Sequence, residues 1–288
     1  MKVSKPRITI CILCLMGATA AGLRAAPAAG KPLSILFIGN SYTSVNQLPS
    51  IVQAMAASAG YAKPEVGANL PGGRTLLQHS QNPKTLELVD QGSGGGAPWD
   101  VVVLQEQSQT PAFAEVNPGI RQGFLDGAKS LCQRIRKRSP NARVVLYQTW
   151  ARHAEVWETK PAEVQALGAS PGEMQNRIRK SYQALAEAMN HGAGRDVFIA
   201  PVGDTWEINY RSPHPVRLHG NDGSHPNPSG SYLAGLVLFA TIYDASPNKV
   251  TWLVPGVPEA DAAVLKKLAA EPRAKGNKQV GPLENGAR

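Results

Sequence analysis

Short apolar runs and longer amphipathic segments alternate along this chain. Several of the short runs are continuous and rich in β-branched residues, which is typical of strands that are buried on both faces. The longer segments repeat apolar residues three or four positions apart, which predicts helices. The expected strands are 33–38, 65–69, 100–104, 143–148 and 196–202, and the expected helices are 44–59, 75–89, 120–138, 172–189 and 229–243.

Strands that alternate with long helices predict βαβ units. The predicted fold class is α/β, a three-layer α/β/α arrangement whose central parallel sheet has about five strands joined by right-handed crossovers. In such sheets, ligands bind beyond the carboxyl ends of the strands. We therefore expect the chemistry to lie in the loops after Ile38, Asn69, Leu104 and Val202.

The N-terminal residues have the pattern of a secretory signal peptide. Lys2, Lys5 and Arg7 precede an apolar segment, and small residues follow it. We expect cleavage near Ala25 or Ala26 and export to the periplasm or the medium; an uncleaved anchor is the alternative. The predicted organisation is a signal peptide at 1–26, one enzyme-sized domain at 27–264 and a basic flexible tail at 265–288.

The distribution of charge excludes one class of partner. The chain has a net charge of +9, of which the leader carries +4 and the tail another +4, so the body is close to neutral at +1. A nearly neutral body lacks the field of a nucleic-acid-binding domain. We expect no nucleic-acid partner and, after cleavage, no stable membrane insertion. The basic run 134–138 is interpreted as a solvated helix end, with a phosphate site as the alternative.

Cysteine usage indicates no disulfide framework. Only Cys132 remains once the leader is removed, so no internal disulfide is possible. Because it lies in an apolar stripe, we interpret it as a buried small residue rather than as a nucleophile.

Two polar segments have residues suited to nucleophilic catalysis. Ser41 lies between the first strand and a helix, so its hydroxyl can project from the sheet edge beside the N–H groups of a helix N-terminus. Asp222 and His225 lie three residues apart before the last helix, so the carboxylate can orient the imidazole toward a serine. The alternatives are helix capping by Ser41 and an ordinary Pro/Asn/Gly loop around Asp222.

Two further loops offer hydrogen-bond donors. Gly73 follows the second strand, where a glycine lets a backbone N–H approach a ligand closely. Gln105 and Gln107 follow the third strand, and a side-chain amide at that edge can donate to an oxyanion. The alternatives are a simple turn for the glycine and plain surface polarity for the two glutamines.

Taken in order, these features resemble the SGNH (GDSL-type) hydrolase superfamily over residues 33–243. The segment FIGNSYT is similar to the first block of that superfamily, PGGRT to its second and DGSHPNPSG to its fifth. The resemblance implies a flavodoxin-like α/β/α fold and a serine esterase without a cofactor. It also implies that Ser41 is the nucleophile, His225 the base and Asp222 its orienting acid, with Ser41 and Gly73 donating to the oxyanion.

The third block departs from the usual pattern of the superfamily, which places Gly-x-Asn-Asp after the third strand. The sequence LQEQS is similar instead to the Gln-containing version of some carbohydrate acetylesterases, so Gln105 or Gln107 would replace the Asn in the oxyanion hole. The expected function is hydrolysis of small acyl esters, acetyl above all, with a small-molecule or glycan ester as partner. A general short-chain esterase or lipase is the alternative within the enzyme class.

Two further hypotheses concern substrate binding. Asn40 is a candidate substrate-binding residue. Aromatic side chains could also form a wall on which a sugar stacks, with core packing as the alternative; the residues would be Trp150, Trp157, Trp206 and Tyr210.

Two functions compete with that of a serine esterase. They are a non-catalytic carbohydrate-binding protein on a hydrolase scaffold and a metal-dependent hydrolase. The metal ligands of that last rival would be His214, His219, Asp222 and His225, whose spacing matches no common motif, so we expect no metal.

Overall fold

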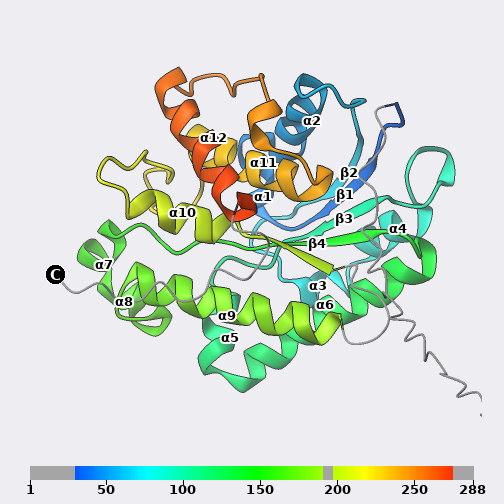
Figure 1. Cartoon of the computed structure of the whole chain (residues 1–288). Coiled ribbons are helices and arrows are strands. Elements are labelled where there is room, and N and C mark those ends of the chain that lie inside the picture. Colours follow the sequence, from blue (N-terminus) through cyan, green and yellow to red (C-terminus); the bar gives the residue numbers. More distant parts are fainter. Residues whose placement is uncertain (1–29, 191–196, 275–288) are drawn as a thin grey trace, which may run out of the picture.

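The computed structural model describes residues 30–190 and 197–274. The expected signal peptide at 1–26 lies outside the described residues, as do residues 275–288 of the expected tail. Five strands form one parallel sheet in the order β2-β1-β3-β4-β5 (Figure 1). The strands are β1 (Ser34–Ile38), β2 (Glu65–Asn69), β3 (Val101–Leu104), β4 (Arg143–Tyr147) and β5 (Val197–Ala200). The predicted three-layer α/β fold is confirmed.

The register of the sheet brings the strand ends level. Ile38 at the end of β1 is paired with Asn69 of β2 on one side and with Leu104 of β3 on the other. Leu104 in turn is paired with Leu146, next to the last residue of β4. Because all five strands are parallel, the loops that follow them leave from the same edge of the sheet.

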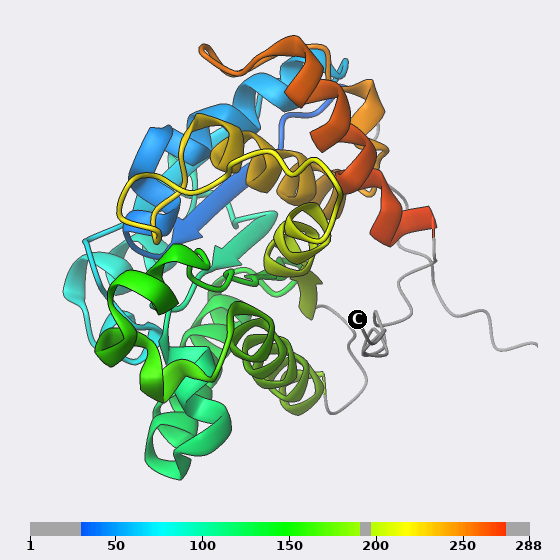
Figure 2. The same ribbon diagram turned by 90° about the vertical axis from the view of Figure 1, so that its left-hand side faces the viewer.

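Side chains alternate along each strand, so the sheet supports two separate cores. Ile35 and Phe37 of β1 pack into the core on one face, and Leu36 and Ile38 pack into the core on the other. Figures 1 and 2 show the two helical layers on either side of the sheet. One layer consists of α2 (Leu48–Ser58), α10 (Val202–Tyr210), α11 (Pro228–Tyr243) and α12 (Glu259–Ala274); the other contains α3 (Leu76–His79), α4 (Pro83–Gln91), α5 (Thr110–Val116), α6 (Pro118–Arg138) and α9 (Pro171–Met189).

Two predicted helices are interrupted. In the segment 44–59, α1 (Ser41–Ser44) ends, η1 (Val45–Gln47) follows and α2 begins at Leu48, because Asn46 and Gln47 both adopt positive φ angles, of 55° and 56°. The segment 75–89 divides into α3 and α4, because Asn82 caps a new helix that has a proline at its first position. Hydrophobic periodicity continues across both breaks, which is why the pattern alone did not reveal them.

The remaining short elements lie in connections. The polar segment 150–171, which contains two prolines, forms short helices. These are α7 (Glu155–Thr159), α8 (Pro161–Val164) and η3 (Gln165–Leu167), and η2 (Gly94–Gly96) and η4 (Pro247–Lys249) lie elsewhere. Helices α5, α10 and α12 were not predicted from the sequence.

The prediction of a flexible tail from residue 265 is wrong for its first part. Residues 265–274 continue helix α12, and Leu265 is completely buried in the core that also contains α11. Leu268 and Ala269 are buried in the same core. The lysines of this segment suggested a tail, but its apolar residues recur at the helical spacing and pack into the core with α10 and α11.

The basic run and the cysteine have the structural roles that were expected of them. Arg134 forms an ion pair with Asp90, and Arg138 donates to backbone carbonyls at the end of α4, including that of Asp90. Cys132 is buried in the core beneath α6. The side chains of Arg134 and Arg138 therefore hold α6 against α4.

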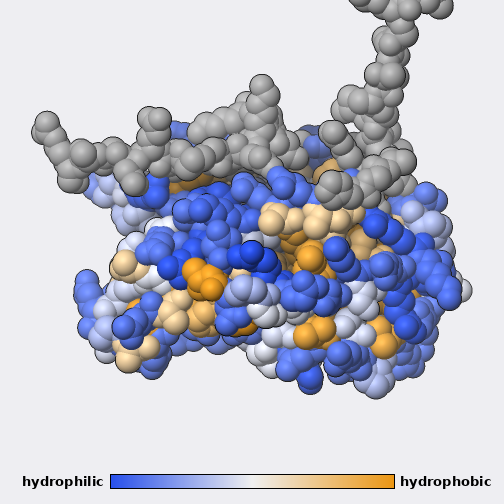
Figure 3. Space-filling model, turned by 90° about the horizontal axis from the view of Figure 1, so that it is seen from below, coloured by the Kyte–Doolittle hydropathy of each residue, from blue (hydrophilic) through white to orange (hydrophobic). Residues whose placement is uncertain are grey.

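The surface on the side of α5, α6 and α9 is mostly hydrophilic. Figure 3 shows this side from below, with apolar residues gathered in a few patches. The large apolar side chains exposed among the described residues are Leu77, Val116 and Val264. None of the described helices combines the length and the apolar character that a membrane crossing requires.

The corrected end of the domain is testable by one substitution. Leu265→Ala should lower the free energy of unfolding by about 2–5 kcal/mol, because it leaves a cavity in a closed core. The neighbouring Val264 is 42% exposed, so Val264→Ala is a matched control whose effect should stay within about 0.5 kcal/mol. Chemical denaturation measures both. Equal, small effects would show that 265–274 does not belong to the folded domain.

Candidate active site

Ser41 lies at the start of the short helix that follows β1. Asn40 caps this helix, and its Oδ1 accepts the N–H of Tyr42 at 3.1 Å. Gly39 links strand and helix where a Cβ atom would lie 2.7 Å from Gln105 Oε1, so only glycine fits there. The tight turn thus aims Ser41 beyond the carboxyl edge of the sheet.

His225 and Asp222 complete a chain of contacts with Ser41. His225 Nε2 lies 2.8 Å from Ser41 Oγ, although the two residues are 184 positions apart. His225 Nδ1 lies 2.5 Å from Asp222 Oδ2. The structure therefore brings together the hydroxyl, imidazole and carboxylate that the sequence singled out.

The loop around Asp222 holds its carboxylate in the ionised form. Its other oxygen, Oδ1, accepts the backbone N–H of Ser224 at 2.9 Å and that of His225 at 3.0 Å. Burial alone would raise the pKa of Asp222, but these bonds and the bond to the His225 ring lower the pKa to about 2. Gly223 makes the loop possible, since its φ is +66° and a Cβ would collide with Val156.

A column of stacked aromatic rings supports both loops. Tyr42 stacks on Trp150 with ring centroids 4.5 Å apart, and Trp150 stacks on Trp206 at 3.9 Å. The Tyr42 hydroxyl lies 2.8 Å from Ser224 Oγ, and Trp150 Nε1 donates to the Ser224 carbonyl at 3.0 Å. Ser224 lies between Asp222 and His225, so this column fixes the acid–base loop against the residue next to Ser41.

The three residues open onto a small pocket of about 260 Å³. Six of its ten lining residues were singled out by the sequence analysis, and four were not. Its lining residues are Asn40, Ser41, Tyr42, Gly73, Gln107, Ser108, Arg152, Asp222, Ser224 and His225.

The geometry distinguishes between the two candidate glutamines. Gln105 is completely buried and does not line the pocket. Its Oε1 accepts the N–H of Asn40 at 3.0 Å and the hydroxyl of Thr43 at 2.8 Å, and its Nε2 donates to Asn40 Oδ1 at 2.9 Å. Gln105 therefore positions the turn before Ser41 rather than a substrate.

Gln107 faces the pocket and its amide nitrogen remains available. Its Oε1 accepts the N–H groups of Gln109 and Thr110 at the start of α5. Its Nε2 has a contact of 3.5 Å with Ser108 Oγ, too long for a strong hydrogen bond. This anchoring leaves the Nε2 donor of Gln107 at the pocket wall.

The other donors predicted for an oxyanion also lie at the pocket. Gly73 lines it with a φ of +66°, a conformation that favours glycine. The N–H of Ser41 belongs to the first turn of a helix, where no intrahelical acceptor is available. Asn40 borders the pocket, but its side chain is occupied, since Nδ2 donates to the carbonyl of Arg74 at 2.9 Å. Asn40 is thus a link between the two loops.

The hypothesis of an aromatic wall for sugars is wrong for its two central residues. Trp150 and Trp206 are each 1% exposed and stack inside the core, so the prediction that Trp150 binds substrate fails. Burial of two apolar rings against each other excludes a sugar from either face. Trp157 and Tyr210 are partly buried and do not line the pocket.

The segment proposed as a metal site has other partners. His219 is buried, with Nδ1 2.8 Å from the Tyr210 hydroxyl and Nε2 3.0 Å from the Ala151 carbonyl. Burial lowers the pKa of His219 to about 3, so its ring is neutral at ordinary pH. Within residues 30–190 and 197–274, no three His, Cys, Asp or Glu side chains are grouped so that they could hold a metal ion.

Sequence reasoning missed Arg152, Ser108, Tyr42 and Ser224 as pocket residues. Arg152 follows β4 at the carboxyl edge of the sheet, so the rule that located the other loops would have found it too. Nothing in the local pattern marks Tyr42 or Ser224, because their roles depend on a contact between segments 182 residues apart.

A buried acid supports the oxyanion side of the pocket. Glu106 Oε1 accepts the N–H of Gln107 at 2.6 Å, and Oε2 accepts the N–H of Leu76 at 3.1 Å. Burial raises the pKa of Glu106 from 4.5 to about 8, and the two N–H groups offset only part of this effect. Glu106 thereby fixes the strand-end loops that carry Gln107 and Gly73.

This pKa predicts a pH-dependent stability. The folded chain keeps the Glu106 proton up to pH about 8, whereas the unfolded chain releases it near 4.5. The stabilisation is therefore complete below that lower pH and decreases as the pH rises toward 8. Because buried histidines such as His219 act in the opposite direction, the quantity to measure is the difference between wild type and Glu106→Gln.

Denaturation curves between pH 5 and pH 8 provide the measurement. The free energy of unfolding of the wild type should decrease relative to that of Glu106→Gln over this interval, since the variant has no group to titrate at that position. Parallel stability curves would mean that Glu106 titrates normally and is not buried as a proton-bearing acid.

Comparison with known proteins identifies the scaffold of the chain. No protein-family model and no curated protein sequence matches the chain. Among solved structures, it is similar to a DUF4886 family protein from Bacteroides uniformis, with a TM-score of 0.68, 16% identity and coverage of 86% of this chain and 97% of that one. A second, from Slackia heliotrinireducens and assigned to the SGNH hydrolases, has a TM-score of 0.54, 27% identity and coverage of 74% and 100%.

A third similar structure belongs to a protein of Parabacteroides merdae that is assigned as a GDSL-like lipase, with a TM-score of 0.53, 15% identity and coverage of 75% and 97%. The two structures at 15% and 16% identity show that the fold is shared. The structure at 27% identity is also similar to this chain in sequence, and it is assigned to the SGNH hydrolases. The resemblance indicated by the motifs is confirmed: the chain has the scaffold of the SGNH (GDSL-type) hydrolases.

Proposed function

We propose that this chain is an exported serine esterase that hydrolyses small acyl esters, acetyl esters above all. The observation that carries the proposal is the unbroken chain of contacts from Ser41 Oγ through the His225 ring to Asp222. Such a series lets one imidazole remove a hydroxyl proton and return it to a leaving group. The hydrolase scaffold of the similar structures agrees with this chemistry.

In the first half of the reaction, Ser41 Oγ attacks the carbonyl carbon of the ester while its proton passes to His225 Nε2. Asp222 accepts the Nδ1–H and stabilises the imidazolium that forms. The bond to the alcohol then breaks, and the alcohol leaves with the proton from Nε2. The product of this half is an acyl group on Ser41.

In the second half, water attacks the acyl carbon and gives a proton to His225, which returns it to Ser41 as the acid leaves. During both steps a negative charge develops on the carbonyl oxygen. The N–H groups of Ser41 and Gly73 and the amide Nε2 of Gln107 border the pocket and are the proposed donors to it. Each such donor is typically worth about 2.7–4 kcal/mol.

The size of the pocket favours a short acyl group. Its volume of about 260 Å³ lies below the range of about 300–1,000 Å³ that is usual for sites that enclose larger ligands. A long acyl chain would have to extend into solvent. The proposed carbohydrate alcohol rests on the Gln-containing third block, and the proposed export rests on the pattern of residues 1–26.

Replacement of the nucleophile tests the proposal directly. Ser41→Ala should lower turnover of para-nitrophenyl acetate by about 10³-fold or more, because Ser41 Oγ is the hydroxyl that lies 2.8 Å from His225 Nε2. Ser44→Ala is the matched control, since Ser44 is exposed at the other end of the same helix. A fluorophosphonate should label Ser41 in the wild type, as read by peptide mass. Full turnover in Ser41→Ala would refute the serine mechanism.

Removal of the charge at Asp222 tests the orientation of the imidazole. Asp222→Asn should lower kcat by about 10²–10⁴-fold with little change in KM, because an amide stabilises the wrong tautomer of His225 and does not balance an imidazolium. Asp126→Asn, on the far helix α6, should leave both constants as they are. Equal rates for Asp222→Asn and the wild type would remove Asp222 from the mechanism.

A further inference from the structure

Arg152 places a positive charge in the wall of the active-site pocket without an acidic partner. It lies in the loop after β4 and is partly exposed. Other arginines on this side of the molecule have such partners: Arg217 is paired with Glu155, and Arg179 with Asp204 and Glu207. No described carboxylate lies within ion-pair distance of the Arg152 guanidinium, so its hydrogen-bond donors are available to a ligand.

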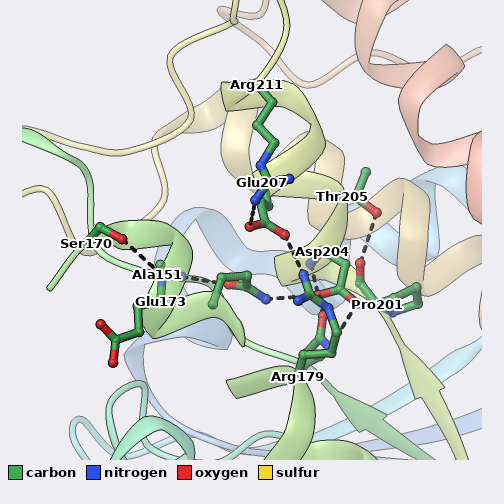
Figure 4. A network of polar contacts seen from close by, with 11 residues as sticks. Ala151, Ser170, Glu173, Arg179, Pro201, Asp204, Thr205, Glu207 and Arg211 are labelled. Atoms are coloured by element: carbon green, nitrogen blue, oxygen red, sulfur yellow. Dashed lines mark hydrogen bonds and ion pairs between the residues drawn. The ribbon is translucent and has the colours of Figure 1, made fainter. Parts of the chain in front are cut away.

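The backbone that carries Arg152 is held by a buried polar network. Its N–H donates to Met174 Sδ at 3.4 Å, and the N–H of Ala151 donates to Gln175 Oε1 at 3.0 Å. Gln175 Nε2 in turn donates to Asp204 Oδ1 at 3.1 Å. Figure 4 shows the adjoining part of this network between α9 and α10, where Arg179 donates to Asp204 and Glu207. These hydrogen bonds therefore hold the backbone of the loop in place at Arg152.

Arg152 shares the pocket with one acid, and that acid is engaged by other partners. Among the described residues that line the pocket, Asp222 is the one acid, and its carboxylate is occupied by the His225 ring and two backbone N–H groups. The Arg152 charge lowers the pKa of Tyr42, against the larger effect of burial, which raises it. Its field thus reaches the residue next to Ser41.

We propose that Arg152 selects esters that carry an anionic oxygen group, a carboxylate in the first instance. A guanidinium binds a carboxylate through two parallel hydrogen bonds, a geometry that no neutral group reproduces. The inference rests on the proposed esterase function and narrows its substrate class. The carboxylate can belong to the alcohol or to the acyl part of the ester, and Arg152 recognises the same chemistry in both.

Two pairs of matched esters distinguish these sources. The alcohol arm compares the acetate esters of para-hydroxybenzoate and para-hydroxybenzamide. The acyl arm compares phenyl hemisuccinate with phenyl succinamate, corrected for the uncatalysed hydrolysis that an internal carboxylate accelerates. In each pair the carboxylate is replaced by a neutral amide of the same shape. In at least one arm, the wild type should prefer the carboxylate by about tenfold or more in kcat/KM.

Three variants connect this preference to Arg152. Arg152→Gln should reduce the ratio of kcat/KM for the anionic ester to that for the neutral ester by about tenfold, and Arg152→Lys should retain part of it. Arg217→Gln removes the same charge from a nearby arginine that does not line the pocket, and it should keep the wild-type ratio. Raising the salt concentration from about 0.05 M to about 0.5 M should weaken the wild-type preference.

The outcomes separate this inference from the proposed function. Turnover of the neutral esters with equal rates for the anionic ones would overturn the role of Arg152 and leave the esterase intact. If Arg152→Gln and Arg217→Gln reduce the preference for the anionic ester equally, the preference comes from the overall charge of the protein, and the inference is overturned. No turnover of any of the four esters by the wild type would overturn both proposals.

Discussion

The site depends on the contact between two loops that are far apart in the sequence. Ser41 follows the first strand and His225 precedes α11, and their contact of 2.8 Å requires both loops to be fixed at the same edge of the sheet. The buried pair Tyr42 and Ser224 provides that connection, and the stacked ring of Trp150 supports it from below. Because a stacked, buried hydroxyl pair has few alternative arrangements, the hydroxyl and the imidazole are positioned before a substrate arrives.

The opposite wall of the pocket is held by side chains that do not face it. Gln105 uses its amide to bind the backbone and side chain of Asn40, and Glu106 binds the N–H groups of Leu76 and Gln107. These buried polar groups connect the loops after β1, β2 and β3. The two glutamines after β3 therefore have different positions: Gln105 supports the turn before Ser41, and Gln107 borders the pocket.

The fold follows from short-range patterns in most places. Continuous β-branched runs such as 101–104 appear as central strands, because burial on both faces demands apolar residues at every position. The pattern failed where a backbone angle or a distant surface decided the structure. Asn46 and Gln47 break a periodic helix through positive φ angles, and residues 265–274 are helical because α10 and α11 offer a surface that covers their apolar face.

The sequence by itself determined which residues are chemically able to act: Ser41, Asp222 and His225 were all identifiable from residue type, spacing and their places at strand and helix ends. The tertiary structure decided the rest. It buried Trp150 and Gln105, and it brought Gln107 and Arg152 to the pocket that Ser41 lines. The physical reason is that residue type and local spacing specify what a side chain can do. Whether it reaches the pocket depends on packing between segments that are far apart in the chain.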